Sequence, residues 1–221
     1  MSDISLIFDR AIDDSIRTLK SLKKLESGVA KAADLIGQCL RAGNKLLVCG
    51  NGGSAADAAH FVTELVVRFA KDRSAHPAIC LASDGGLLTA AANDYGFDEI
   101  FARQVAAFGQ PGDVLICLTT SGQSKNVVRA LEEAKARKLK TIALLAATAD
   151  QLSAWPISIF WCAAIRLRGF RKRTSFCSTF CARFSSLISS RRKAVEAGVP
   201  PAFRVRNTAD AAAPTGLLRL L

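Results

Sequence analysis

A glycine-rich turn between an apolar run and an alanine-rich run constrains the fold of this chain more than any other stretch. Residues 45–49 have the continuous hydrophobicity of a buried strand. Residues 54–70 form an Ala-rich amphipathic run that is typical of a helix. Between the two runs stand three glycines and an asparagine: Gly50, Asn51, Gly52 and Gly53. Glycine lets the backbone approach a ligand closely, and the start of a helix offers unpaired N–H groups. The stretch therefore predicts a strand, a turn and a helix that together bind an anion such as a phosphate.

A histidine and a glutamate follow on the same predicted helix. His60 and Glu64 are four residues apart, so they share one face of the helix. An imidazole and a carboxylate can ligate one metal ion or move protons to and from a substrate. A lone pair of this kind is more often a surface histidine beside a solvated glutamate. The preceding glycine turn favours the functional interpretation. The other histidine, His76, is interpreted as a loop residue.

Further apolar runs predict a parallel sheet. They occupy residues 78–82, 114–118 and 141–146. Helical patterns between the apolar runs cover residues 54–70, 87–92, 99–108 and 126–137. Runs that are apolar throughout, and do not alternate, indicate strands buried on both faces by helices. We therefore predict an α/β fold, a three-layer sandwich of the flavodoxin-like or Rossmann-like kind. Two helical patterns ahead of the first strand, at 4–27 and 29–41, predict an N-terminal helical hairpin that covers the sheet or builds a subunit interface.

A second polar loop follows the third predicted strand. It contains four hydroxyl side chains, those of Thr119, Thr120, Ser121 and Ser124. Taken alone, the loop is best interpreted as an ordinary helix cap, because Ser and Thr are common in that place. In parallel sheets, however, ligands bind at the carboxyl ends of the strands, where this loop and the glycine turn meet. The pairing favours a phosphate site. Asn93 and Asp94, in a predicted turn after the second strand, belong to the same edge.

Charge divides the chain into two compositions. The net charge is +11, but residues 1–150 hold 18 Lys and Arg against 17 Asp and Glu, whereas residues 151–221 hold 12 against 2. The excess charge therefore does not mark the predicted domain as a nucleic-acid binder, and nucleic acid is an unlikely partner. We divide the chain into N-terminal helices (1–44), an α/β core (45–150) and a basic tail (151–221).

Composition also predicts the setting of the protein. No apolar run reaches the roughly 20 residues that a membrane span needs. The N-terminus lacks the basic and apolar regions of a signal peptide. The seven cysteines are scattered without Cys-x-x-Cys pairs, which indicates free thiols. We therefore expect a cytoplasmic protein that does not insert into a membrane.

At this point four segments carry a family resemblance. The glycine turn with its helix, residues 91–105, residues 112–135 and the N-terminal helices together resemble the SIS (sugar isomerase) domain, over about residues 1–147. Within that family they are similar to the phosphoheptose isomerases, which interconvert sedoheptulose 7-phosphate and D-glycero-D-manno-heptose 7-phosphate for surface polysaccharide synthesis.

The resemblance implies roles for single residues and for the assembly. Asn51, Gly52 and Gly53 would contact the sugar phosphate, and Thr119, Thr120, Ser121 and Ser124 would bind its phosphate group. Asn93 and Asp94 would hold substrate hydroxyls. His60 and Glu64 would ligate one zinc ion per subunit, and Glu64 would also be the catalytic base. The family implies a homotetramer.

The resemblance ends near residue 147. The family continues with a short strand and a helix that carries a Gln-Glu-x-His segment, which completes the metal site, whereas residues 151–221 contain no histidine. Shifting the reading frame across residues 155–184 permits codons for an amphipathic string that contains this segment. We therefore interpret residues 151–221 as a frame-shifted, disordered tail, and we expect impaired activity of the chain as written. A genuine basic extension that binds nucleic acid or anionic lipid is the weaker interpretation.

Two other functions are weighed against isomerisation. Some SIS proteins bind a partner such as a replication initiator without being known as enzymes, and others sense sugar phosphates as regulators. His60 and Glu64 favour chemistry over binding alone. The regulators usually carry an added DNA-binding domain, and the residues before 45 do not suggest one.

Overall fold

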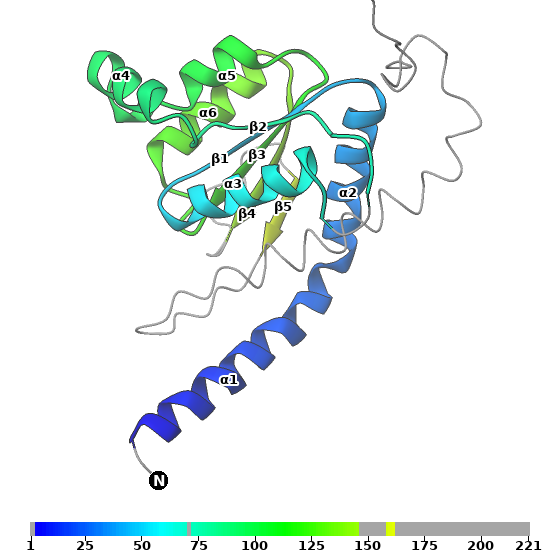
Figure 1. The fold of residues 1–221 in the computed structure, drawn as a ribbon, viewed down its shortest axis with the longest axis vertical. Helices are drawn as coiled ribbons and strands as arrows, with labels where there is room; N and C mark the ends of the chain where they lie inside the picture. The colour runs from blue at the N-terminus through cyan, green and yellow to red at the C-terminus, as the bar shows by residue number, and fades with distance from the viewer. Residues whose placement is uncertain (1–2, 70–71, 146–157, 162–221) are drawn as a thin grey trace, which may run out of the picture.

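The computed structural model describes residues 3–69, 72–145 and 158–161, and these form one parallel sheet with helices on both faces (Figure 1). The strands are β1 (Leu46–Gly50), β2 (Ala78–Cys80), β3 (Val114–Thr119), β4 (Lys140–Leu145) and β5 (Ser158–Trp161). They lie side by side in the order β2-β1-β3-β4-β5. This is the flavodoxin-like order, in which the chain changes direction across the sheet between β1 and β3. The predicted fold class is confirmed.

The helices divide between the two faces of the sheet. They are α2 (Glu26–Arg41), α3 (Gly53–Val66), α4 (Gly85–Tyr95), the short η2 (Phe97–Glu99), α5 (Ala102–Phe108) and α6 (Lys125–Ala136). Helices α2 and α3 pack with Leu46 and Val48 of β1 on one face. Helices α5 and α6 pack with Leu47 and Cys49 on the other face. Successive strand residues thus enter opposite cores, which explains why the central strands are apolar throughout.

The register of β1 against β3 determines that the two predicted loops begin next to each other at the same edge of the sheet. Leu46 pairs with Val114 at one end, and Gly50 pairs with Leu118 at the other. Every residue of both strands is buried. The glycine turn and the hydroxyl loop therefore leave the sheet from neighbouring positions.

A buried carboxylate fixes the opposite ends of these two strands. Asp113, which is 1% exposed, accepts hydrogen bonds from the backbone N–H groups of Lys45 (3.0 Å) and Gln110 (2.8 Å). Its second oxygen also accepts from Lys45 Nζ at 2.6 Å. A buried carboxylate needs such partners, because an unpaired charge in the core is very costly. Asp113 thus holds the start of β1 and the turn before β3 together.

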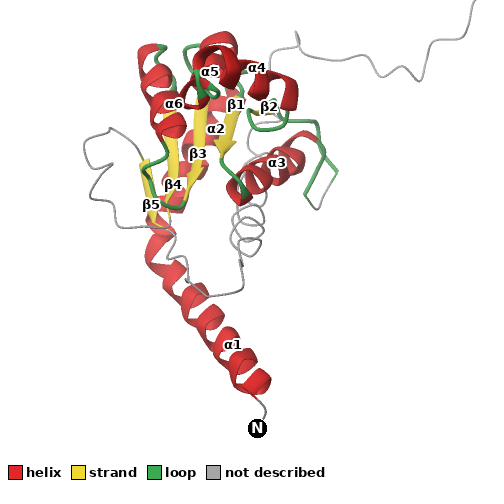
Figure 2. Cartoon of the chain, turned by 90° about the vertical axis from the view of Figure 1, so that its left-hand side faces the viewer, coloured by secondary structure: helices red, strands yellow, loops and turns green. Residues whose placement is uncertain are grey.

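The N-terminal helices are present but differ from the predicted hairpin. Helix α1 (Asp3–Ser21) continues through the 3-10 helix η1 (Leu22–Leu25) directly into α2. In both views α1 extends away from the sheet and does not fold back beside α2 (Figures 1 and 2). Large apolar side chains on α1 are solvent-exposed, including Ile4 (78%), Ile7 (61%) and Phe8 (65%). The hairpin prediction failed because no reversal turn separates the two helical patterns.

Other predicted boundaries shift by a few residues. The predicted turn around Asn93 and Asp94 is instead the last turn of α4, which ends at Gly96 with a φ of 88°. The short strand β5 falls within residues 151–221, the stretch interpreted as a disordered tail. It pairs in parallel with β4, which corrects that interpretation for residues 158–161. Residues 146–157 and 162–221, on which the frame-shift interpretation also depends, lie outside the described residues. Among the described helices, none has the length and apolar character needed to cross a bilayer.

Candidate active site

The turn after β1 has the close backbone approach that its glycines predicted. A Cβ atom on Gly50 would lie 2.7 Å from the carbonyl oxygen of Ser54, so a side chain there would collide with the start of α3. Gly52, the N-cap of α3, has a φ of 55°, which favours glycine. In the first backbone hydrogen bonds, the N–H of Ser54 donates to the carbonyl oxygen of Asn51, and the N–H of Ala55 donates to that of Gly52. No side chain caps α3, and the N-terminal end of its helix dipole suits an anion.

The loop after β3 forms the second half of the same edge. Thr119 is buried, and its hydroxyl oxygen accepts a hydrogen bond from the N–H of Gly122 at 3.2 Å. The Ser121 hydroxyl accepts from the N–H of Gln123, also at 3.2 Å. Ser124 is the N-cap of α6, but its side chain makes no capping hydrogen bond. Thr120 and Ser121 are exposed. Hydroxyl groups and helix N–H groups together make a neutral site suited to a phosphate.

An asparagine pair joins the two loops. Asn51 Nδ2 donates to Asn126 Oδ1 at 2.9 Å, and Asn126 Nδ2 donates to Asn51 Oδ1 at 2.8 Å. Asn126 lies in the first turn of α6 and is 2% exposed. No role was predicted for Asn126. Its polar side chain on the otherwise apolar face of α6 could have indicated a buried hydrogen bond.

His60 and Glu64 form a direct pair on α3. His60 Nε2 lies 2.9 Å from Glu64 Oε1. The Glu64 side chain is 18% exposed, whereas the His60 side chain is 45% exposed. Arg73 donates to the backbone carbonyl of Glu64, which ties the segment after α3 back to this helix. The imidazole can therefore orient the carboxylate or share a proton with it.

Asn93 and Asp94 lie in the last turn of α4. Both are exposed, and Asn93 Nδ2 donates to Asp94 Oδ1 at 2.8 Å. Among the hydrogen bonds of the described residues, none joins this pair to the glycine turn or to the hydroxyl loop. Their predicted role toward substrate hydroxyls stays a prediction.

With this geometry in place, comparison with known proteins identifies the family. The SIS domain family matches residues 12–146 of the chain. The chain belongs to the SIS domain family.

Several members of that family are closely similar. The phosphoheptose isomerase of Shewanella sp. (strain ANA-3) is 49% identical over 132 residues, which are 59% of this chain and 67% of that protein. The solved phosphoheptose isomerase of Francisella tularensis is 32% identical with a TM-score of 0.72, and covers 86% of this chain and 100% of its own. That of Neisseria gonorrhoeae is also 32% identical, with a TM-score of 0.67 over 88% of this chain and 99% of its own.

Thiols next to the loops of this SIS domain are not suited to nucleophilic chemistry. Cys49 and Cys117 pair across β1 and β3, and their sulfur atoms are 3.4 Å apart. Their mutual hydrogen bond, with burial, raises the pKa of Cys117 well above the ordinary thiol value. Burial likewise raises the pKa of Cys39 to about 11. A thiol with a raised pKa is a poor nucleophile at neutral pH, which argues against such a role for Cys117 and Cys39.

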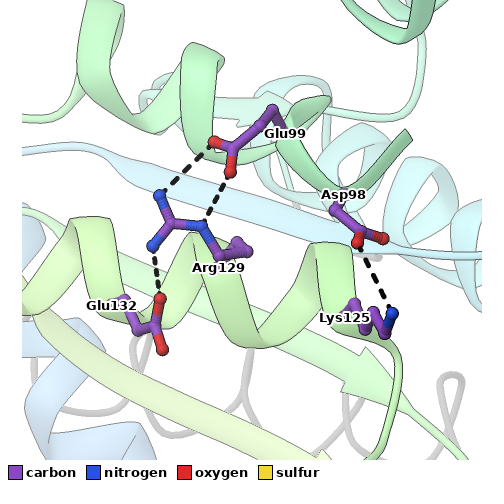
Figure 3. Close-up of polar contacts among 5 residues, drawn as sticks. All are labelled: Asp98, Glu99, Lys125, Arg129 and Glu132. Atoms are coloured by element: carbon purple, nitrogen blue, oxygen red, sulfur yellow. Dashed lines mark hydrogen bonds and ion pairs between the residues drawn. The ribbon is translucent and has the colours of Figure 1, made fainter. Parts of the chain in front are cut away.

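An ion-pair network attaches the segment after α4 to α6 (Figure 3). Arg129 Nε lies 2.7 Å from Glu99 Oε1, and Arg129 also pairs with Glu132 one turn along the same helix. Lys125 Nζ and Asp98 Oδ2 are 4.0 Å apart. The network connects η2, just after Asn93 and Asp94, with the helix that begins at the hydroxyl loop.

We predict that Arg129→Ala lowers the free energy of unfolding, because it removes hydrogen bonds between charged groups of two elements. Arg137→Ala is the matched control, since Arg137 pairs with Glu133 one turn back on the same helix. We expect the control to cost less than about 0.5 kcal/mol. Urea unfolding measures both values. Equal losses in the two variants would contradict the assigned role of Arg129.

Proposed function

We propose that this chain carries the aldose–ketose isomerase chemistry of sedoheptulose 7-phosphate, giving D-glycero-D-manno-heptose 7-phosphate. The observation that carries the proposal is the joining of two anion-binding loops at the β1–β3 edge, with an imidazole–carboxylate pair on the helix that leaves it. The phosphoheptose isomerases that are 48–50% identical to this chain support the choice of substrate.

The spacing along α3 suits a long phosphosugar. Glu64 is eleven residues after the first residue of the helix, so it lies roughly 16 Å along the axis from the glycine turn. His60 lies roughly 10 Å along the same axis. In sedoheptulose 7-phosphate the phosphate and the carbonyl are at opposite ends of the carbon chain. A phosphate at the turn therefore places the reacting carbons toward His60 and Glu64.

Glu64 is the proposed base. Its carboxylate removes a proton from C1, the carbon next to the C2 carbonyl, which leaves an enediolate, and returns that proton to C2. Over the same reaction the C1 hydroxyl gives up its proton and the C2 oxygen takes one up, so that no proton is gained or lost overall. His60 holds Glu64 Oε1 at 2.9 Å and so fixes the direction of the base. The loops bind the phosphate and hold the sugar in place while the proton moves.

Zinc remains a prediction that the described residues support only in part. His60 and Glu64 are suitable ligands, but a catalytic zinc site usually has three protein ligands. Among residues 3–69, 72–145 and 158–161, no group of three or more His, Cys, Asp or Glu residues is placed to hold a metal ion. When bound, zinc would polarise the carbonyl oxygen. With two ligands, the pair does not make a complete zinc site, and the proposed proton transfer does not depend on a metal.

The proposal includes a limit on activity. Residues 151–221 lack the histidine and the Gln-Glu-x-His segment that the family resemblance implies. We therefore infer that the chain as written binds the sugar phosphate but completes turnover more slowly than about 1 per second. A non-catalytic phosphosugar-binding or replication-initiator-binding protein is the alternative. The named isomerases that are about half identical to this chain do not favour it.

The proposal extends to the oligomeric state of the protein and to its location in the cell. We propose a homotetramer, because the exposed apolar side chains of α1 recur at helical spacing and offer a surface for other copies of the helix. We also propose a cytoplasmic location and a role in heptose supply for surface polysaccharide.

We predict that Glu64→Gln abolishes exchange of the substrate hydrogen next to the carbonyl with deuterium from the solvent. The loss should be at least about 100-fold, because the amide cannot accept the proton. Proton NMR of sedoheptulose 7-phosphate in D2O follows this exchange, which does not require complete turnover. Thr63→Ala is the matched control, since the exposed Thr63 hydroxyl donates to the Ala59 carbonyl of its own helix. Exchange at the wild-type rate in Glu64→Gln would refute the role of Glu64.

We predict that Phe8→Glu lowers the mass of the assembly in solution, because a charge on the apolar face of α1 opposes burial of that face. Light scattering coupled to size exclusion measures the mass. Arg10→Glu, at an exposed position of the same helix that is already polar, is the control and should leave the mass unchanged. A monomeric wild-type chain would contradict the proposed assembly.

A further inference from the structure

The reciprocal hydrogen bonds between Asn51 and Asn126 join elements that the strands alone do not hold together. The β1–β3 pairing ends at Gly50 and Leu118. Beyond that point, the chain leads from β1 to α3 on one face of the sheet and from β3 to α6 on the other face. The two loops therefore diverge into different layers. The asparagine pair, with bonds of 2.9 Å and 2.8 Å, crosses between them.

The chemistry of the pair fixes the orientation of both amides. A primary amide has two N–H donors and one oxygen acceptor, and each asparagine here uses one donor and its oxygen. Rotating either amide by half a turn would place NH2 against NH2 and oxygen against oxygen. Because Asn126 is 2% exposed, water cannot readily replace a lost bond. The pair thus keeps one N–H of Asn51 for a ligand and holds the backbone of the turn in place.

We propose that Asn126 is a positioning residue for phosphate binding, which acts through Asn51 and does not itself touch the ligand. By holding the turn at 50–53 against the loop at 119–124, it makes the N–H and hydroxyl groups of both converge on one phosphate. This inference rests on the proposed function, since it assumes that the two loops bind the phosphate of the sugar.

The test is the affinity of the purified full-length chain for inorganic phosphate, measured by calorimetry from pH 8 to pH 5. In Asn126→Asp the ionised carboxylate can only accept hydrogen bonds, so at pH 8 it opposes Asn51 Oδ1. We expect about a tenfold weaker affinity than wild type at that pH. A protonated Asp can donate to Asn51 Oδ1 and accept from Nδ2, which restores both bonds. The ratio of variant to wild-type dissociation constants should therefore fall toward one as the pH is lowered.

Two comparisons make the result specific. Asn126→Ala cannot re-form the pair, so its ratio to wild type should stay raised at every pH. The charged groups nearest along α6, Lys125 and Arg129, pair with Asp98 and Glu99. Both substitutions leave these four residues unchanged, so we expect their titration to cancel in the ratio. The titration of inorganic phosphate itself cancels in the same way.

Each outcome decides between the hypotheses. An unchanged phosphate affinity in Asn126→Asp and Asn126→Ala, with only a lower melting temperature, would show a purely structural role and overturn the proposal. If Asn126→Asp does not fold at pH 8, a weakened affinity in folded Asn126→Ala still supports it, and an unchanged affinity overturns it. Failure of the wild-type chain to bind phosphate would instead overturn the proposed phosphate site.

Discussion

The parallel pairing of β1 with β3 is the contact on which the rest of this structure depends. It is the point where the strand order reverses, and every residue of both strands is buried. Polar contacts fix the pairing at both ends. Asp113 binds the start of β1, and the Asn51–Asn126 pair joins the loops that follow Gly50 and Leu118. A polar group that is buried without a partner is costly. Another register of β1 against β3 would break these contacts, so they favour the observed register.

Helix α3 connects the β1–β3 edge of the sheet to the proposed acid–base pair. Its first residues close the glycine turn, and its last turns carry His60 and Glu64. Phe61 and Leu65, which follow His60 and Glu64 along the same segment, are buried in the core against the sheet. The packing that stabilises the helix thereby also fixes the direction of the acid–base pair. The proposed phosphate site and the proposed base lie at two distances along this one helix, which suits a substrate with a phosphate at one end and a carbonyl at the other.

Sequence reasoning predicted the elements that depend on local patterns. The apolar strands, the glycine turn and the hydroxyl loop follow from composition and period, and the structure has them at the expected places. The hairpin of α1 and α2 was wrong because hydrophobic period does not show whether two helical runs reverse or continue. The role of Asn126 was missed because its partner is 75 residues away, and only the strand register brings the two together. The turn around Asn93 was assigned from residue type, whereas the helix ends only at Gly96.

The measurement that tests the central claim most directly is a crystal structure of the chain with bound sedoheptulose 7-phosphate. The account predicts the phosphate group between the starts of α3 and α6, within hydrogen-bond distance of the backbone of residues 52–53 and of the hydroxyl groups of Ser121 and Ser124. It also predicts the carbonyl end of the sugar next to Glu64. A phosphate bound away from the β1–β3 edge, or a sugar whose carbonyl end lies away from Glu64, would contradict it.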